Sequence, residues 1–159
     1  MLVRRIARPL FAAWFVTEGV GVLRAPTPHV ARAEAAWKRA ATRLDLPPAP
    51  SDARMRAVVR AHGGAMVVAG AMLATGRAPR AAALCLAGLM VPLAVVDHPF
   101  GKRGAPDASG GRDRFVRALS MLGGALLAGI DTEGRPGLTW RVENARAARR
   151  AAHEVRDAT

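Results

Sequence analysis

Ionisable residues lie inside or beside the apolar stretches of this 159-residue chain, and a polar group there is normally either paired or functional. Glu18 is the acid that lies deepest within an apolar segment, so we expect either a function or an ion pair with Arg60 or Arg117. A pocket between helices could receive a quinone headgroup, a proton or a small ligand. The residues predicted to form such a pocket are Glu18, Arg60, His62, Asp97, His98 and Arg117.

A structural explanation competes for four of these residues. Arg60, Asp97, His98 and Arg117 could mark helix ends and extend to water. No metal site is predicted, because His62 and His98 occupy separate positions and no third ligand accompanies them. The single Cys85 excludes an internal disulfide, a dithiol motif and a cysteine zinc site. No phosphate-binding loop, nucleophile elbow or catalytic carboxylate pair is present, so no catalytic residue is assigned.

Two charge-free apolar runs, residues 61–76 and 81–96, must position these side chains. Each run is about 24 Å long as a helix, whereas a bilayer core is about 30 Å thick. The connection Arg77-Ala78-Pro79-Arg80 is short, basic and contains a proline. The pattern therefore predicts a helical hairpin that crosses a membrane and returns.

The whole apolar pattern predicts an all-α fold, a four-helix transmembrane up-down bundle with spans at about 6–23, 57–75, 81–98 and 115–130. An amphipathic helix at about 28–45 would lie in the membrane interface, with Trp37 at headgroup level. We expect residues 1–140 to form the membrane domain and residues 141–159 to form a basic cytoplasmic tail, itself helical. For both amphipathic segments, a solvated basic helix is the alternative.

The first apolar segment has a second interpretation as a signal peptide, with Arg4 and Arg5 as its charged region. No small-residue cleavage site follows it, and Glu18 interrupts the apolar stretch, which favours a retained span. Four spans place both termini on one side, and basic residues beside the spans favour cytoplasmic termini. Tracing the spans then places all six predicted pocket residues at the opposite membrane face.

The formal charge of +12 and the pI of about 11.8 favour anionic partners, either lipid headgroups or nucleic acid. Tyrosine is absent and aromatic residues make up 4% of the chain, so few side chains are available for base stacking. We therefore expect a lipid bilayer as the partner, and no nucleic acid.

Three stretches carry a resemblance to a known family. They are residues 60–80 with Gly63, Gly70 and the basic turn, then Val91-Pro92 followed by His98-Pro99-Phe100, and finally residues 122–128 running into 131–141. In this order they resemble the DoxX family of small bacterial integral membrane proteins, in its actinobacterial-type branch. The resemblance covers most of residues 4–150 and implies a four-span bundle in the bacterial inner (plasma) membrane. Some relatives are subunits of a thiosulfate:quinone oxidoreductase. Others belong to a membrane-associated oxidoreductase complex that links a superoxide dismutase and a sulfurtransferase.

Three functions are therefore expected, in this order. The first is an accessory or anchoring subunit of a membrane oxidoreductase complex in redox or oxidative-stress homeostasis, without catalysis of its own. The second is a quinone-linked subunit of the thiosulfate:quinone type, in which Glu18, His62 and His98 handle protons. The third is a soluble, basic helical protein that binds nucleic acid. Oxidoreductase partner proteins follow from the first two functions, and homo-oligomerisation is left open.

Overall fold

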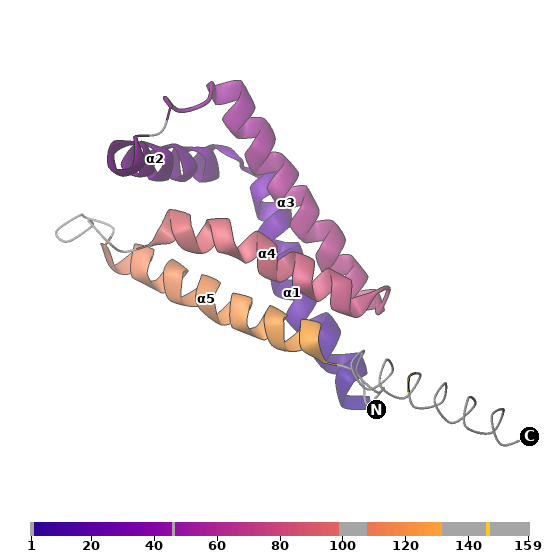
Figure 1. The fold of residues 1–159 in the computed structure, drawn as a ribbon. Coiled ribbons are helices and arrows are strands. Elements are labelled where there is room, and N and C mark those ends of the chain that lie inside the picture. Colours follow the sequence, from indigo (N-terminus) through magenta and orange to yellow (C-terminus); the bar gives the residue numbers. More distant parts are fainter. Residues whose placement is uncertain (1, 46, 99–107, 132–145, 147–159) are drawn as a thin grey trace, which may run out of the picture. The chain divides into compact units, whose positions relative to one another are not determined.

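The computed structural model describes residues 2–45, 47–98, 108–131 and 146, and these residues are helical apart from short connections. The helices are α1 (Leu2–Arg24), α2 (Thr27–Leu44), α3 (Asp52–Thr75), α4 (Pro79–Asp97) and α5 (Ala108–Ile130) (Figure 1). The chain divides into two units, residues 1–129 and residues 130–159. The description below concerns the first unit and Ile130, the last residue of α5. Most of the predicted tail at 141–159 lies outside the described residues. The predicted all-α class is confirmed for the described part of the chain.

Proline and left-handed residues define several of the helix boundaries. Pro28 and Pro79 occupy the first turns of α2 and α4, where the missing amide proton costs nothing. At the other ends, Asp45 caps α2 and Gly76 caps α3, both with positive φ. The predicted basic turn therefore joins α3 to α4.

In the part of the chain that the structure describes, three helices are long and apolar enough to cross a membrane, namely Ile6–Arg24, Asp52–Thr75 and Pro79–Asp97. They correspond to the first three predicted spans, although α3 begins at Asp52 rather than near residue 57. Helix α5 covers the predicted fourth span, but it does not meet the same measure. It begins at Ala108, and its first half carries too many charged residues: Arg112, Asp113, Arg114 and Arg117.

Helices α1 and α3 touch at their backbones through glycine. A Cβ placed on Gly19 would lie 2.6 Å from the carbonyl oxygen of Gly63, and a Cβ on Gly70 would lie 2.8 Å from Cγ2 of Val16. Close approach of this kind, made possible by small residues, is the usual way in which helices pack in lipid. This register sets Glu18 and His62, the chain neighbours of Gly19 and Gly63, at the same level of the bundle.

Helix α5 packs on α1 and α4 through two further glycines. A Cβ on Gly124 would lie 2.8 Å from the Phe11 ring, and one on Gly129 would lie 2.6 Å from Cδ2 of Leu84. The Nε–H of Arg80 also donates to the Gly129 carbonyl oxygen at 3.2 Å. Helices α4 and α5 consequently run side by side (Figure 1).

The packed helices are apolar on the surfaces between them and on the surfaces that face outward. Their interior contains Phe15, Met66, Leu73, Leu86 and Met90, which are fully buried. Large hydrophobic side chains also point outward from four helices: Ile6 and Leu10, Val68, Leu84, Val91 and Val95, and Leu119, Leu126, Leu127 and Ile130. An apolar exterior of this extent is unusual for a protein in water and is normal for one surrounded by lipid.

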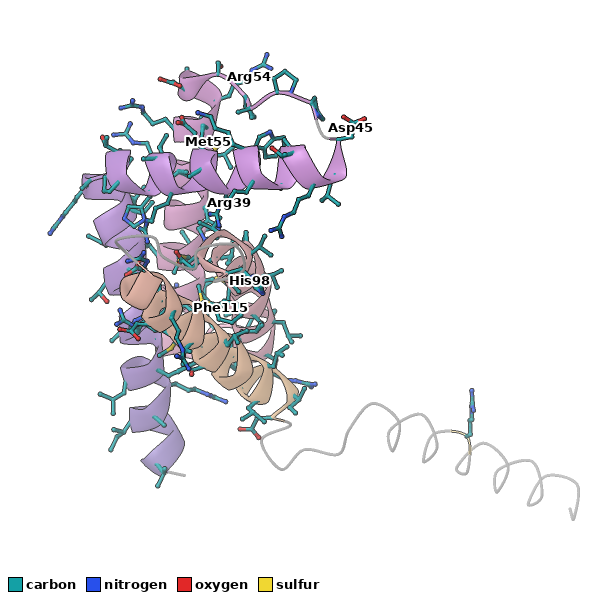
Figure 2. All side chains as sticks on the ribbon, turned by 90° about the vertical axis from the view of Figure 1, so that its left-hand side faces the viewer. Arg39, Asp45, Arg54, Met55, His98 and Phe115 are labelled. Atoms are coloured by element: carbon teal, nitrogen blue, oxygen red, sulfur yellow. The ribbon has the colours of Figure 1, made fainter. Side chains whose placement is uncertain are left out.

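The predicted interfacial helix is confirmed as a separate element, α2, but it is also part of the bundle. Val30 is buried, and α2 packs against α3 and α4. The Arg39 guanidinium reaches across to donate to the Val96 carbonyl oxygen at the end of α4, at 3.2 Å (Figure 2). Trp37, expected at headgroup level, donates its indole N–H to the Pro47 carbonyl oxygen at 3.1 Å. The apolar face of α2 is therefore used at least partly for packing on protein.

Candidate functional site

A cavity of about 220 Å³ lies beneath α2, and all five helices contribute to its wall. Helices α1 and α4 have their C-terminal ends near α2, and α3 and α5 have their N-terminal ends near α2. The distance of a residue from α2 can therefore be judged from its position along its helix. Met55 of α3 lies near α2 (Figure 2), whereas Met66, three turns later, lies deeper. The cavity is thus at one end of the bundle, where the sequence places its predicted pocket.

Four of the six predicted pocket residues line this cavity. They are Glu18 from α1, His62 from α3, Asp97 from α4 and Arg117 from α5. Four separate helices thus bring ionisable side chains to one place, as the up-down tracing of the chain predicts.

The two other predicted residues lie outside the cavity lining. Arg60 is exposed on α3, so it faces outward as expected, but it lies inside the helix because α3 begins at Asp52. His98 follows α4 directly, and its ring meets the Phe115 ring edge-on, with centroids 5.0 Å apart (Figure 2). His98 does not line the cavity, and its expected proton-handling role stays a prediction.

Asp97 is the most deeply buried ionisable residue that the structure describes, at 6% exposed. Its Oδ1 accepts a hydrogen bond from Arg114 Nε at 3.3 Å, and Arg32 lies 4.0 Å from the same oxygen. The interpretation of Asp97 as a residue extending to water is therefore wrong. Two guanidinium groups, from α2 and α5, provide the compensation that a buried carboxylate needs.

Sequence reasoning missed the contribution of α2. His29, Arg32 and Ala33 all line the cavity, and an Arg32 N–H donates to His29 Nδ1 at 2.8 Å. Burial, and next the Arg32 charge, lower the pKa of His29, while the charges of Glu18 and Asp97 oppose this shift. Their spacing places these three residues on one face of a helix, but the same spacing also fits a face that meets lipid.

His62 carries an unusual polar atom. Its Nε2 is buried and has no hydrogen-bond partner within the part of the chain that the structure describes. A buried polar atom without a partner costs about 1–3 kcal/mol, and such atoms are rare in folded proteins. Since His62 also lines the cavity, a bound molecule with a suitable oxygen would satisfy this nitrogen.

Glu18 and Arg117 face the same cavity but do not pair with each other. Among the described residues, no hydrogen bond or ion pair involves the Glu18 carboxylate or the Arg117 guanidinium. The predicted pairing of Glu18 with Arg60 or Arg117 is therefore not formed. Both groups are available to a ligand.

The remaining wall of the cavity is apolar. Trp14, Met66, Pro92, Leu93 and Ala118 form its deeper part, and Val22, Val58, Val59 and Val96 lie between them and α2. Within the described residues, no group of three His, Cys, Asp or Glu side chains is arranged to hold a metal ion. The arrangement suits a molecule with a hydrocarbon body and a small polar head.

Within the described residues, the fold and the cavity define a helical protein with three helices long and apolar enough to cross a membrane and a pocket lined by ionisable side chains. Comparison of the chain with protein-family models, with curated proteins and with solved structures gave no match.

Proposed function

We propose that this chain is a multi-pass protein of the bacterial plasma membrane, of the DoxX type, and an accessory or anchoring subunit of an oxidoreductase complex. The observation that carries the membrane part is the outward apolar surface on α1, α3 and α4, the three helices long enough to span. The resemblance of residues 60–80, 91–100 and 122–141 to that family supports the oxidoreductase part. Redox or oxidative-stress homeostasis is the process in which such a complex acts.

We propose further that α5 is a fourth span. Leu119, Leu126, Leu127 and Ile130 are exposed along it, and lipid is the solvent that such a surface fits. Its charged residues gather near its N-terminal end, close to the end of α4, where Arg114 meets Asp97. Charges at a helix end can reach the headgroup region, so they do not prevent insertion. Four spans with cytoplasmic termini would place α2 and the pocket at the opposite membrane face.

A second function, that of a quinone-linked oxidoreductase subunit, is favoured by one specific observation. Glu18 and His62 lie at the same level of the bundle, on helices in backbone contact, and both line the pocket. A carboxylate and an imidazole so placed can accept and donate protons beside a ring headgroup. Under this proposal Glu18 and His62 handle the protons, without His98.

Fractionation of cells is the first test of the proposed function. The protein should stay in the membrane pellet after alkaline carbonate washing and leave it only with detergent. Recovery in the soluble fraction would overturn the membrane proposal and favour the basic nucleic-acid-binding alternative. Affinity capture from detergent-solubilised membranes should then recover oxidoreductase subunits in constant stoichiometry, and their absence would overturn the accessory role.

An assay of purified protein separates the two membrane functions. Quinone reduction dependent on thiosulfate or sulfide, lost in both Glu18→Gln and His62→Phe, would support the quinone-linked subunit. Absence of turnover, together with co-purifying oxidoreductase subunits, would support the accessory subunit.

A further inference from the structure

The charges that line the pocket do not balance. Three guanidinium groups, those of Arg32, Arg114 and Arg117, face two carboxylates, those of Glu18 and Asp97. The Asp97 carboxylate lies within ion-pairing distance of both Arg32 and Arg114, whereas the Glu18 carboxylate forms no ion pair among the described residues. With both histidines neutral, one cationic charge is left over in a pocket with apolar walls. Such a site favours a singly charged anion.

Arg117, an exposed residue of α5, is the arginine of the pocket that has no ion pair with the Asp97 carboxylate. It lies about one helical turn deeper than Arg114, next to the apolar part of the pocket that includes Ala118. The described part of the chain provides no hydrogen-bonding or ion-pairing partner for its guanidinium group. A planar guanidinium matches a carboxylate or phosphate with two parallel hydrogen bonds.

The rest of the pocket constrains the body of the ligand. Trp14, Met66 and Leu93 offer hydrocarbon and aromatic contacts at the deep end. His62 Nε2 is buried without a partner, and as the neutral Nε2–H tautomer it would donate to an oxygen. The ligand therefore needs a hydrocarbon part for the deep end and an anionic oxygen for Arg117 and His62.

We propose that the pocket binds an acidic amphiphile, namely a hydrocarbon chain that carries a singly charged carboxylate or phosphate head. This inference rests on the proposed membrane location and names the ligand class of the same pocket. A free fatty acid and an anionic phospholipid both have this chemistry. In either case the Arg117 guanidinium binds the head, and the chain lies against Trp14.

Trp14 allows binding to be measured directly. The full chain with Trp37→Phe and Trp140→Phe retains Trp14 as its single tryptophan. This protein, purified in an uncharged detergent, would be titrated with dibromostearic acid, whose bromine atoms quench nearby indole fluorescence. Saturable quenching is expected. The methyl ester of the same acid has no charge and should quench only by partition into the micelle, without saturation.

A pair of matched variants tests the assignment to Arg117. Arg117→Gln should weaken binding by about tenfold or more, equivalent to about 1.4 kcal/mol. Arg60→Gln removes an exposed arginine outside the pocket and should leave the affinity unchanged. Equal weakening in both variants would show that general surface charge attracts the acid, and it would overturn the proposal. Circular dichroism of both variants establishes that the fold is retained.

Two brominated phospholipids separate the sources of the ligand. Quenching by phosphatidylglycerol but not by phosphatidylcholine would identify an anionic lipid headgroup, whereas quenching by the fatty acid alone would identify a free acid. Either result supports the proposal. Equal saturable quenching by the acid and its methyl ester would overturn the acidic ligand class. That failure is distinct from failure of the proposed function, since membrane fractionation and partner capture do not depend on the ligand.

Discussion

The backbone of Gly19 lies so close to that of Gly63 that a Cβ on Gly19 would approach the Gly63 carbonyl oxygen to 2.6 Å. This contact fixes the register of α1 against α3, and it therefore sets the level at which Glu18 and His62 enter the pocket. A backbone oxygen cannot move aside as a flexible side chain can. The pocket depends on this contact, although neither glycine contributes a functional group.

Replacement of Gly19 by alanine should destabilise the bundle. The new methyl group must push α1 away from α3, and overpacking of this kind costs about 1–3 kcal/mol. Gly21→Ala, on the same helix, is the matched control, because nothing lies within 4 Å of its Cβ position. Thermal unfolding in detergent, followed by circular dichroism, would measure the difference. Identical transition temperatures for the two variants would contradict the close packing of α1 on α3.

Asp97→Asn should loosen the attachment of both α2 and α5. Removal of the carboxylate charge leaves Arg32 and Arg114 facing each other without their common partner. A hydrogen bond to a charged group contributes about 1.5–3 kcal/mol, and partial exposure of both arginines places the loss near the lower end of this range. Limited proteolysis between α2 and α3 should therefore become faster.

Asp113→Asn provides the control for Asp97→Asn, because Asp113 is exposed on α5, next to Arg114. Its proteolysis rate should equal that of the unmodified chain. A rate for Asp97→Asn that also equals the unmodified rate would show that the Asp97 ion pairs do not hold α2 on the bundle.

Acidification should weaken the packing of α2 through His29. Burial lowers the pKa of His29 in the folded chain below its ordinary value of 6.5. As the pH falls through 6.5, the unfolded chain takes up this proton first, so stability decreases toward lower pH. His29→Gln cannot take up the proton and should show a smaller decrease. Unfolding transitions above and below pH 6.5 would measure this, and an unchanged pH dependence in His29→Gln would contradict the assignment.

Much of this arrangement could be predicted from the sequence, because apolar runs and their connections determine which residues share a membrane face. Glu18, His62, Asp97 and Arg117 meet in one cavity as the up-down order of the helices predicts. The sequence also predicts the helical hairpin of α3 and α4 and a separate amphipathic helix.

Other features could not be predicted, because they depend on how the helices rotate and fold back. Helix α2 reaches the pocket with His29 and Arg32, and periodicity alone does not distinguish a face that packs on protein from one that meets lipid. The sequence leaves open whether Asp97 lies in the pocket or extends to water at a helix end, and only the structure shows that α2 and α5 cover it. The glycine contacts between α1 and α3 could not be predicted either, because the alanine-rich sequence offers many small residues in equivalent positions.

A membrane-spanning α3 requires that its two connections, to α2 and to α4, lie on opposite sides of the membrane. In a Cys85→Ser background, Pro48→Cys places a thiol between α2 and α3, and Ala78→Cys places one between α3 and α4. Both positions are exposed. In spheroplasts, whose plasma membrane is intact and uncovered, a membrane-impermeant maleimide should label Pro48→Cys. It should label Ala78→Cys only after the membrane is permeabilised, because α3 crosses between the two thiols. Labelling of both thiols from the same side would contradict a membrane-spanning α3, and with it the account of the pocket given above.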